Sequence, residues 1–112
     1  MHVLSHTLHY GNGAIEGTKA YKTVDGRCAI FKLNEHTQRL LNSSKMTLMN
    51  VPFTLEELNK AQIELLQKNE LFDGAYIRPL VYLGYGVMGL YHKEAPVKVS
   101  VSAWEWGAYL GE

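Results

Sequence analysis

The sequence predicts an α+β domain with a mostly antiparallel sheet and two helices on one face of the sheet. Strand-like segments lie at both ends of the chain and helical segments lie between them, in the order strand, strand, helix, helix, strand, strand. This grouping is typical of α+β domains, because domains with a parallel sheet alternate strands with helices. An Asp25-Gly26 pair between two apolar runs adds a hairpin, whose two strands are antiparallel.

The first two strands follow an irregular opening segment. Residues 1–13 end in Tyr10-Gly11-Asn12-Gly13, whose glycines and asparagine accept positive φ angles, so this segment predicts a loop with a tight bend. Residues 14–24 and 27–31 then form the two strands of the hairpin around Asp25 and Gly26.

Two helices are predicted in the middle of the chain. Asn34 is placed to cap a first helix over residues 35–45. The second helix starts at a capping box formed by Thr54 and Glu57, and its apolar residues recur at helical spacing as far as residue 69.

Two further strands follow the second helix. Residues 97–104 alternate apolar and polar side chains, which predicts a half-buried strand, whereas the near-continuous apolar run of residues 74–84 indicates a strand covered on both faces. Arg78 interrupts that run. Because a guanidinium keeps its charge, a buried Arg78 must face an anion or a set of acceptors. The alternative is an arginine that reaches solvent from a sheet edge, which Pro79 favours because it donates nothing to a ladder.

The composition limits the classes of function. The 112 residues suffice for one domain, residues 1–112, and 11 basic against 11 acidic residues leave no electrostatic footprint for nucleic acid or an anionic membrane. The single cysteine, Cys28, fits a reducing compartment, and without a signal peptide or a membrane-spanning run we expect a cytoplasmic protein. Three histidines, His2, His6 and His9, have no cysteine or carboxylate at ligand spacing, so no metal site is expected.

Residue types alone suggest one kind of site, which would hold an anion. Arginine and tyrosine donate hydrogen bonds in fixed directions and together bind carboxylates or phosphates. The candidates are Arg39, Arg78, Tyr10, Tyr76 and Tyr109. The alternative for Arg39 is a surface ion pair with Glu35, one helical turn away.

Four motifs, in order and with comparable spacers, resemble a single family. They are Leu8-His9-Tyr10-Gly11 followed by Glu16-Gly17, then Glu35-His36-Thr37-Gln38-Arg39-Leu40, Ala75-Tyr76-Ile77-Arg78-Pro79-Leu80, and Trp106-Gly107-Ala108-Tyr109-Leu110-Gly111. Together they resemble the bacterial branched-chain amino acid aminotransferases, which are pyridoxal-phosphate enzymes of fold type IV. The resemblance runs nearly end to end and covers only the small N-terminal domain of that family, without its first strand or two.

The resemblance implies a role for each matching residue. Arg39 would bind the phosphate of pyridoxal 5'-phosphate, and Tyr76 would donate to the α-carboxylate of the substrate. Arg78 would receive the side-chain carboxylate when glutamate is the substrate. The other implied substrate-binding residues are Ile15, Gly17 and Tyr109, together with Tyr10 and Leu90 contributed by the second subunit of a homodimer or higher homo-oligomer.

The resemblance also implies what the chain lacks. In the family, the lysine that holds the cofactor as a Schiff base lies in the larger C-terminal domain, and no lysine of this sequence matches its motif. We therefore expect the 112 residues to contain no catalytic residue and to be inactive alone. The complete enzyme would transfer the amino group of leucine, isoleucine or valine to 2-oxoglutarate.

Two positions depart from the family pattern. Ile15 stands where the family usually has an aromatic residue, which leaves the substrate preference open, and Lys19 stands where many bacterial members have arginine. The alternatives within fold type IV are a D-amino acid aminotransferase and an aminodeoxychorismate lyase. From a different class, the alternative is a non-catalytic interaction module that keeps the small-domain fold.

Overall fold

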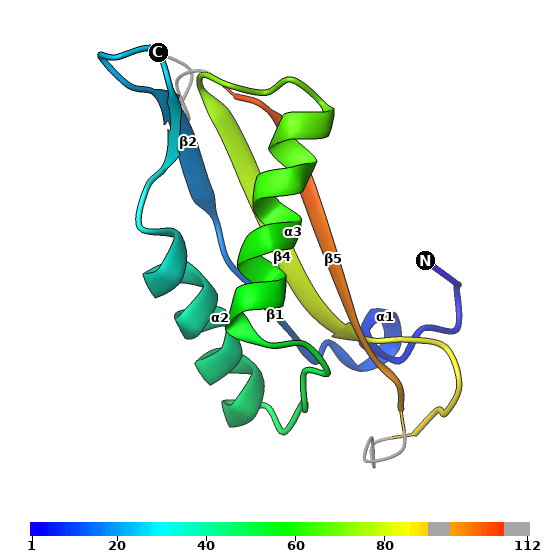
Figure 1. Cartoon of the computed structure of the whole chain (residues 1–112). Helices are drawn as coiled ribbons and strands as arrows, with labels where there is room; N and C mark the ends of the chain where they lie inside the picture. The colour runs from blue at the N-terminus through cyan, green and yellow to red at the C-terminus, as the bar shows by residue number, and fades with distance from the viewer. Residues whose placement is uncertain (90–94, 107–112) are drawn as a thin grey trace.

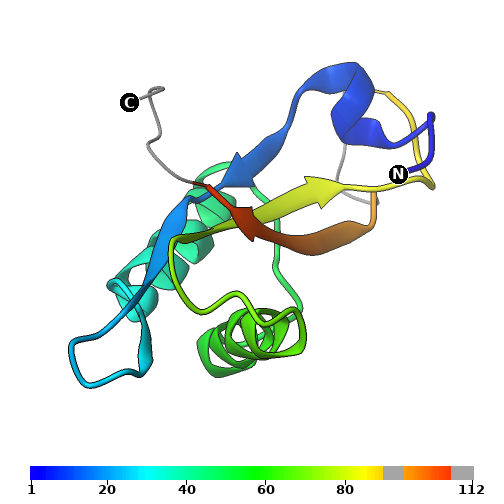
Figure 2. The same cartoon turned by 90° about the horizontal axis from the view of Figure 1, so that it is seen from above.

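A computed structural model describes residues 1–89 and 95–106 and confirms the predicted α+β architecture (Figure 1). The elements in chain order are α1 (His6–Tyr10), β1 (Gly13–Ile15), β2 (Thr18–Lys22), β3 (Cys28–Ile30), α2 (Leu33–Met46), α3 (Leu55–Lys68), β4 (Ala75–Leu83) and β5 (Val97–Glu105). The strands form one five-stranded sheet in which every described pairing is antiparallel. Seen from above, α2 and α3 lie on the same face of this sheet (Figure 2).

Strand β4 is the centre of the sheet. It pairs with β5 over its whole length on one side, and with β1 and β2 in turn on the other. Arg78 therefore does not lie on an edge strand, and the edge alternative is wrong. The strands β1 and β2 pair with β4 in the same register, as if they were one strand. Glu16 and Gly17 form the break between them. Pro79 lies opposite this break: its carbonyl accepts from the Glu16 N–H at 3.1 Å, but proline has no N–H to return.

The hairpin is confirmed, although its first strand is shorter than predicted. Strand β2 pairs with β3 from Ala20–Ile30 to Lys22–Cys28, and the turn between them contains Gly26 at a φ of 89°. The predicted strand over residues 14–24 is divided into β1 and β2 by the break opposite Pro79.

The two long helices confirm the predicted elements, and the start of α2 differs. In α3 the capping box is complete: Glu57 N–H donates to Thr54 Oγ1, and Thr54 N–H donates to Glu57 Oε1, both at 3.1 Å. Asn34 does not cap α2, because the helix already begins at Leu33. The Asn34 side-chain oxygen instead accepts from Asn59 Nδ2 at 2.6 Å and links α2 to α3.

The prediction of a loop over residues 1–13 is wrong for its middle, which forms the short helix α1. This helix ends where the glycine pattern indicates, at Gly11 with a φ of 73°. The Thr7 hydroxyl fixes α1 to the end of β4, accepting from the Leu83 N–H at 2.7 Å and donating to the Asn12 carbonyl at 2.6 Å. A helix of 5 residues is too short to produce an apolar periodicity, so the sequence pattern does not reveal it.

The core lies between the sheet and the two long helices. Alternate residues of β4 point to this side and form two buried clusters with α2 and α3, made of Leu40, Met49, Val81 and Leu83 with Ala14 and Ala95, and of Ala20, Leu66, Ala75 and Ile77. The intervening residues of β4 point to the opposite face, which no described helix covers. On that face Tyr76 is buried against Trp104 and Trp106, and Arg78, Leu80 and Tyr82 are half-buried, so β4 has no exposed residue and the second face is covered in part by side chains.

Candidate functional site

Tyr76 and Arg78 lie side by side on the sheet face opposite the helices. Arg78 Nη2 donates to Tyr76 Oη at 2.7 Å, and the guanidinium carbon lies 5.3 Å from the centre of the tyrosine ring. The Tyr76 ring is held by two tryptophans, with ring-centre distances of 5.1 Å to Trp104 and 4.8 Å to Trp106. Such packing fixes the direction in which the tyrosine hydroxyl points.

Arg78 is only partly satisfied by hydrogen bonds. Its side chain is partly buried, and its buried Nε has no hydrogen-bond partner among the residues that the structure describes. A buried donor without an acceptor costs free energy, about 1–3 kcal/mol. The buried Nε is out of reach of a ligand, but the terminal nitrogens of a half-buried guanidinium can donate to a carboxylate beside the Tyr76 hydroxyl.

Gly17 leaves the space that Tyr76 occupies. A Cβ atom at this position would lie 2.2 Å from Tyr76 Oη and 2.9 Å from the ring carbon that carries it. No side chain can therefore replace the hydrogen of Gly17 while the Tyr76 hydroxyl stays in place. Ile15 lies on the same face, opposite Leu80 in the register, and its side chain is 55% exposed.

Arg39 forms an ion pair with Glu16, not with Glu35. Its Nε and Nη2 donate to the two oxygens of the Glu16 carboxylate at 2.6 and 2.8 Å, and His36 Nδ1 lies 2.9 Å from the same carboxylate. The carboxylate side chain is only 5% exposed, whereas the Arg39 side chain is 66% exposed. The surface-pair alternative with Glu35 is thus not observed.

The charges of this ion pair shift its pKa values in opposite directions. The hydrogen bond from Arg39 lowers the pKa of Glu16 below its ordinary value, and the hydrogen bond from His36 adds to that effect, while burial opposes it. The same carboxylate raises the pKa of Arg39. Both groups therefore stay charged, and Glu16 holds the arginine in one orientation with its outer side open to solvent.

Glu16 and Gly17 connect the two arginine sites. Neighbouring residues of a strand point to opposite faces, so Glu16 faces α2 and Arg39 while Gly17 faces Tyr76. The structure therefore brings Arg39 and the Tyr76–Arg78 pair to the two sides of one two-residue segment. Glu16 is the residue that sequence reasoning did not assign to the site.

Tyr10 lies far from Tyr76 and Arg78 in the same chain. Its hydroxyl accepts from the Gly89 N–H at 3.1 Å, and α1 is fixed at the Leu83 end of β4. Because a strand rises about 3.3 Å per residue, β4 separates that end from Arg78 by roughly 15 Å or more. Two further predicted site residues, Leu90 and Tyr109, lie outside the described residues.

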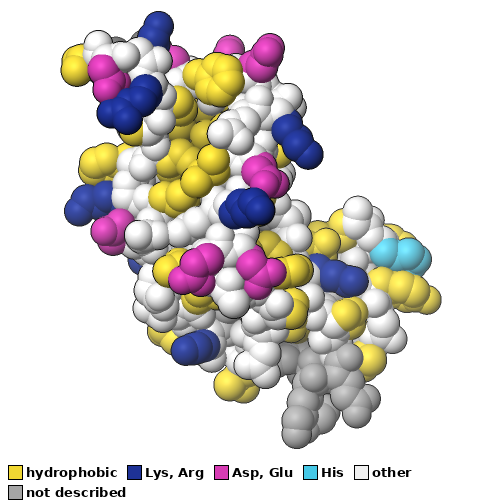
Figure 3. Space-filling view, viewed as in Figure 1, with side chains coloured by type: hydrophobic (Ala, Val, Ile, Leu, Met, Phe, Trp, Pro, Cys, Tyr) yellow, Lys and Arg dark blue, Asp and Glu magenta, His cyan; other side chains and the backbone are white. Residues whose placement is uncertain are grey.

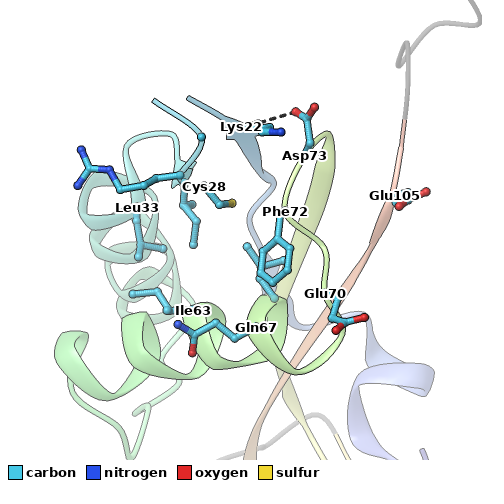
Figure 4. A pocket seen from close by; sticks show the side chains of 13 residues that line it. Lys22, Cys28, Leu33, Ile63, Gln67, Glu70, Phe72, Asp73 and Glu105 are labelled. Carbon is cyan, nitrogen blue, oxygen red and sulfur yellow. Dashed lines mark hydrogen bonds between the residues drawn. The ribbon is translucent and has the colours of Figure 1, made fainter. Parts of the chain in front are cut away.

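A groove of about 940 Å³ lies elsewhere, between the β2–β3 hairpin and the end of α3 (Figure 4). Figure 3 shows apolar surface in the upper part of the molecule, flanked by charged side chains of both signs. None of the predicted site residues that the structure describes lines the groove. Its lining residues include Cys28, Leu33, Ile63, Gln67 and Phe72.

The histidines of the N-terminal segment contact other groups. The His2 ring stacks on Tyr85 at 4.0 Å between ring centres, and the His9 ring bonds the Val3 carbonyl at 2.8 Å. Within residues 1–89 and 95–106, no three His, Cys, Asp or Glu side chains gather as metal ligands would. The helices of the same ranges are too short or too polar to cross a membrane.

Solved structures with the same fold are aminotransferases. A branched-chain amino acid aminotransferase solved with pyridoxamine 5'-phosphate superimposes with a TM-score of 0.88 at 46% identity, covering 100% of this chain and 36% of that chain. The branched-chain amino acid aminotransferase of Escherichia coli gives a TM-score of 0.90 at 38% identity, covering 99% of this chain and 36% of that chain. The fold is thus that of one part of a branched-chain aminotransferase.

Sequence comparison leads to the family itself. Residues 13–112 match the family model of amino-transferase class IV, and the chain belongs to this family. It is 47% identical over 111 residues to the branched-chain-amino-acid aminotransferase of Pseudomonas aeruginosa, and 39% identical over 112 residues to that of Escherichia coli K12. These alignments cover 99% of the chain and 36% of each relative, so the chain spans about a third of their length. The resemblance drawn from the motifs is confirmed.

The contact between Gly17 and Tyr76 predicts a local steric effect. Gly17→Ala should lower the free energy of unfolding by about 1–3 kcal/mol in chemical denaturation, because the added methyl group overlaps the tyrosine hydroxyl. The matched control is the same change in a Tyr76→Ala background, where it should cost much less. An equal loss in both backgrounds would show that Tyr76 is not the obstacle.

The lowered pKa of Glu16 predicts the response to acid. Because the folded state favours the ionised form, its contribution to stability is complete above the ordinary value of 4.5 and is lost as the pH falls through the lower folded-state value. Glu16→Gln should therefore be less stable than the unaltered protein at neutral pH, and its stability should fall less steeply as the pH drops below the ordinary value of 4.5. Glu35→Gln, an exposed control on α2, should leave the dependence of stability on pH unchanged. If Glu35→Gln changed this dependence and Glu16→Gln did not, the acid response would not come from Glu16.

Proposed function

We propose that this chain is the small domain of a branched-chain amino acid aminotransferase, which transfers the amino group of leucine, isoleucine or valine to 2-oxoglutarate with pyridoxal 5'-phosphate. The observation that carries the proposal is the Tyr76–Arg78 pair on the sheet face opposite the helices, where the half-buried guanidinium is fixed beside the tyrosine hydroxyl. The relatives of this chain support the proposal by their names, and one of their structures contains N-(5'-phosphopyridoxyl)-L-glutamate. The proposal places the enzyme in the cytoplasm.

Arg39 fits the cofactor's phosphate. A guanidinium has five N–H donors, and the fork to Glu16 uses two of them, which leaves donors on the side that faces solvent. When bound, the cofactor would withdraw electrons from the α-carbon of the amino acid. Glu16 and His36 would fix the direction of Arg39, and Arg39 would anchor the phosphate by charge-assisted hydrogen bonds.

Tyr76 and Arg78 would recognise the acidic groups of the substrates. The Tyr76 hydroxyl would donate to the α-carboxylate, and Arg78 would pair with the second carboxylate of glutamate or 2-oxoglutarate. When an apolar substrate occupies the same space, the bond from Arg78 Nη2 to Tyr76 Oη would keep part of the guanidinium satisfied. Ile15 and Tyr109 would then contact the branched side chain.

A complete site would require a second copy of the chain. Arg78 lies near the middle of β4 and Tyr10 belongs to α1, which is fixed at the Leu83 end, so the proposal assigns the two side chains to substrates bound in different subunits. In a homodimer, Tyr10 and Leu90 of one subunit would close the substrate pocket of the other. Gly17 would contribute by leaving room for Tyr76.

The lysine that holds the cofactor would lie in another part of the complete enzyme. In the proposal none of the lysines of the 112 residues carries the cofactor, which is consistent with a chain that covers about a third of its relatives' length. In this proposal the small domain binds and orients the reactants, and the remaining part of the enzyme supplies the proton transfer.

The proposed reaction is tested with the full-length protein. It should transfer the amino group of L-leucine to 2-oxoglutarate in the presence of pyridoxal 5'-phosphate, and D-alanine should be a much poorer donor. The 112-residue chain alone is the control and should show no transfer. Preference for D-alanine would favour the D-amino acid aminotransferase alternative, and turnover by the control would refute the assignment of the lysine.

The role of Arg78 predicts a selective defect. In the full-length enzyme, Arg78→Ala should lower kcat/KM for 2-oxoglutarate by about 10- to 100-fold, the range expected for a lost charge-assisted hydrogen bond. The same change should alter kcat/KM for a branched-chain oxo acid by less than about threefold, because that substrate has no second carboxylate. Arg27→Ala, at an exposed arginine of the hairpin, is the control for charge alone. Equal losses with both oxo acids would remove this role.

A further inference from the structure

Both backbone polar atoms of Gly89, its N–H and its carbonyl oxygen, are bonded to side chains of the short helix α1. The Gly89 N–H donates to Tyr10 Oη at 3.1 Å, and the Gly89 carbonyl lies 2.6 Å from His6 Nε2. A carbonyl oxygen accepts only, so His6 donates, and its proton lies on Nε2.

His6 also fixes the other end of the same loop. Its backbone N–H donates to the Gly84 carbonyl at 3.2 Å, so one residue bonds both ends of the segment 84–89. The ring of His6 lies 4.5 Å from that of Tyr10, measured between ring centres. The His6 side chain is buried, with 1% of the residue exposed.

The loop requires such a support because of its composition. It contains Gly84, Gly86 and Gly89, and glycine loses more conformational freedom on ordering than any other residue. Gly89 has a φ of 112°, a conformation that residues with a side chain rarely adopt, and a Cβ placed on it would meet nothing within 4 Å. The two hydrogen bonds from α1 offset part of the entropy lost when such a glycine is held in one conformation.

We propose that His6 is a positioning residue for the apolar part of the substrate pocket. It would not touch the substrate. It holds the Gly89 peptide and the Tyr10 ring together, and so sets the position of Tyr10 and of the exposed Met88 that the second copy would receive. This inference rests on the proposed function, in which Tyr10 contacts the branched side chain bound in the other subunit.

The proposal distinguishes two kinds of substrate. Loosening the loop would weaken the contact with a branched apolar side chain, which depends on the position of Tyr10. It would leave the pairing of a second carboxylate with Arg78 unchanged, because Arg78 is held by Tyr76 on β4 and not by α1. The effect would lie in KM for the branched-chain oxo acid, with kcat retained.

Three variants of the full-length enzyme test the proposal. His6→Leu removes the donor and keeps an apolar side chain, and it should raise KM for the oxo acid of leucine by about tenfold with kcat and KM for 2-oxoglutarate nearly unchanged. His6→Gln can place an amide N–H near the position of Nε2–H, and it should restore KM to within about threefold of the unaltered value. The control is His9→Leu, which changes an exposed histidine of the same helix and should have no effect.

A second readout does not depend on activity. In protein labelled with ¹⁵N-glycine, the Gly89 amide should be protected from hydrogen exchange, and His6→Leu should remove the protection while His9→Leu keeps it. In ¹⁵N-histidine spectra of the unaltered protein, His6 should carry its proton on Nε2, and this measurement remains available if His6→Leu fails to fold.

The outcomes separate the positioning role from its alternatives. Retained Gly89 protection in His6→Leu, or a His6 proton found only on Nδ1, would overturn the proposal. Equal losses of kcat with both oxo acids would show a merely structural role. If the unaltered enzyme transferred no amino group, the proposed function would fail, and the Gly89 measurement would still decide whether His6 holds the loop.

Discussion

The alternation of side chains along β4 is the constraint on which the rest of the structure depends. Ile77 and Val81 point into the core beneath the helices, so Tyr76 and Arg78 must point to the other face. A slip of one residue in the sheet would place the guanidinium in the core, where an unpaired charge is too costly. The register that builds the core therefore also positions the site, and neither can change without the other.

Glu16 and Gly17 join the two faces of the sheet at the break opposite Pro79. Burying the Glu16 carboxylate costs solvation free energy, and the bonds from Arg39 and His36 compensate for it. The result is an arginine whose direction is fixed although its side chain is largely exposed. Gly17, the next residue, contributes by having no side chain, because the Tyr76 hydroxyl lies where a Cβ would be. The direction of Arg39 thus depends on the carboxylate of Glu16. The position of the Tyr76 hydroxyl depends on the missing side chain of the next residue, Gly17.

Local chemistry explains which elements the sequence predicted. The Asp25-Gly26 turn and the capping box at Thr54 are complete within a few residues, so their patterns identify the hairpin and α3. The helix α1 is too short for a periodic pattern. Asn34 was predicted as the N-cap of α2, but the helix begins one residue earlier, at Leu33, so Asn34 lies inside it. Short-range patterns therefore predicted elements, and failed where a neighbouring part of the chain decides the conformation.

Short-range patterns also predicted only part of the candidate site. Arg78 is conspicuous because its neighbours in sequence are apolar, whereas the Glu16–Arg39 pair joins positions 23 residues apart and no local spacing marks it. One signal was available: Glu16 alternates in phase with Ala14, Thr18 and Ala20, all of them buried. A carboxylate in phase with buried positions requires a cation, and Arg39 lies on the helix that packs against that face.

The length of β4 separates the Tyr76–Arg78 pair from α1, which is fixed at the Leu83 end of the strand. Tyr76 and Arg78 lie in the half of β4 away from Leu83, and α1 with Tyr10 is fixed at the Leu83 end, so in the proposed function the two groups serve different substrate sites. In a two-fold symmetric dimer, α1 of each subunit would lie at the substrate site of the other subunit. The same contact would then form twice and complete both sites. In such a dimer, a change in His6 would act on the site of the opposite subunit. A mixed dimer carrying His6→Leu in one subunit and Arg78→Ala in the other would then combine both defects in one site and leave the second site intact.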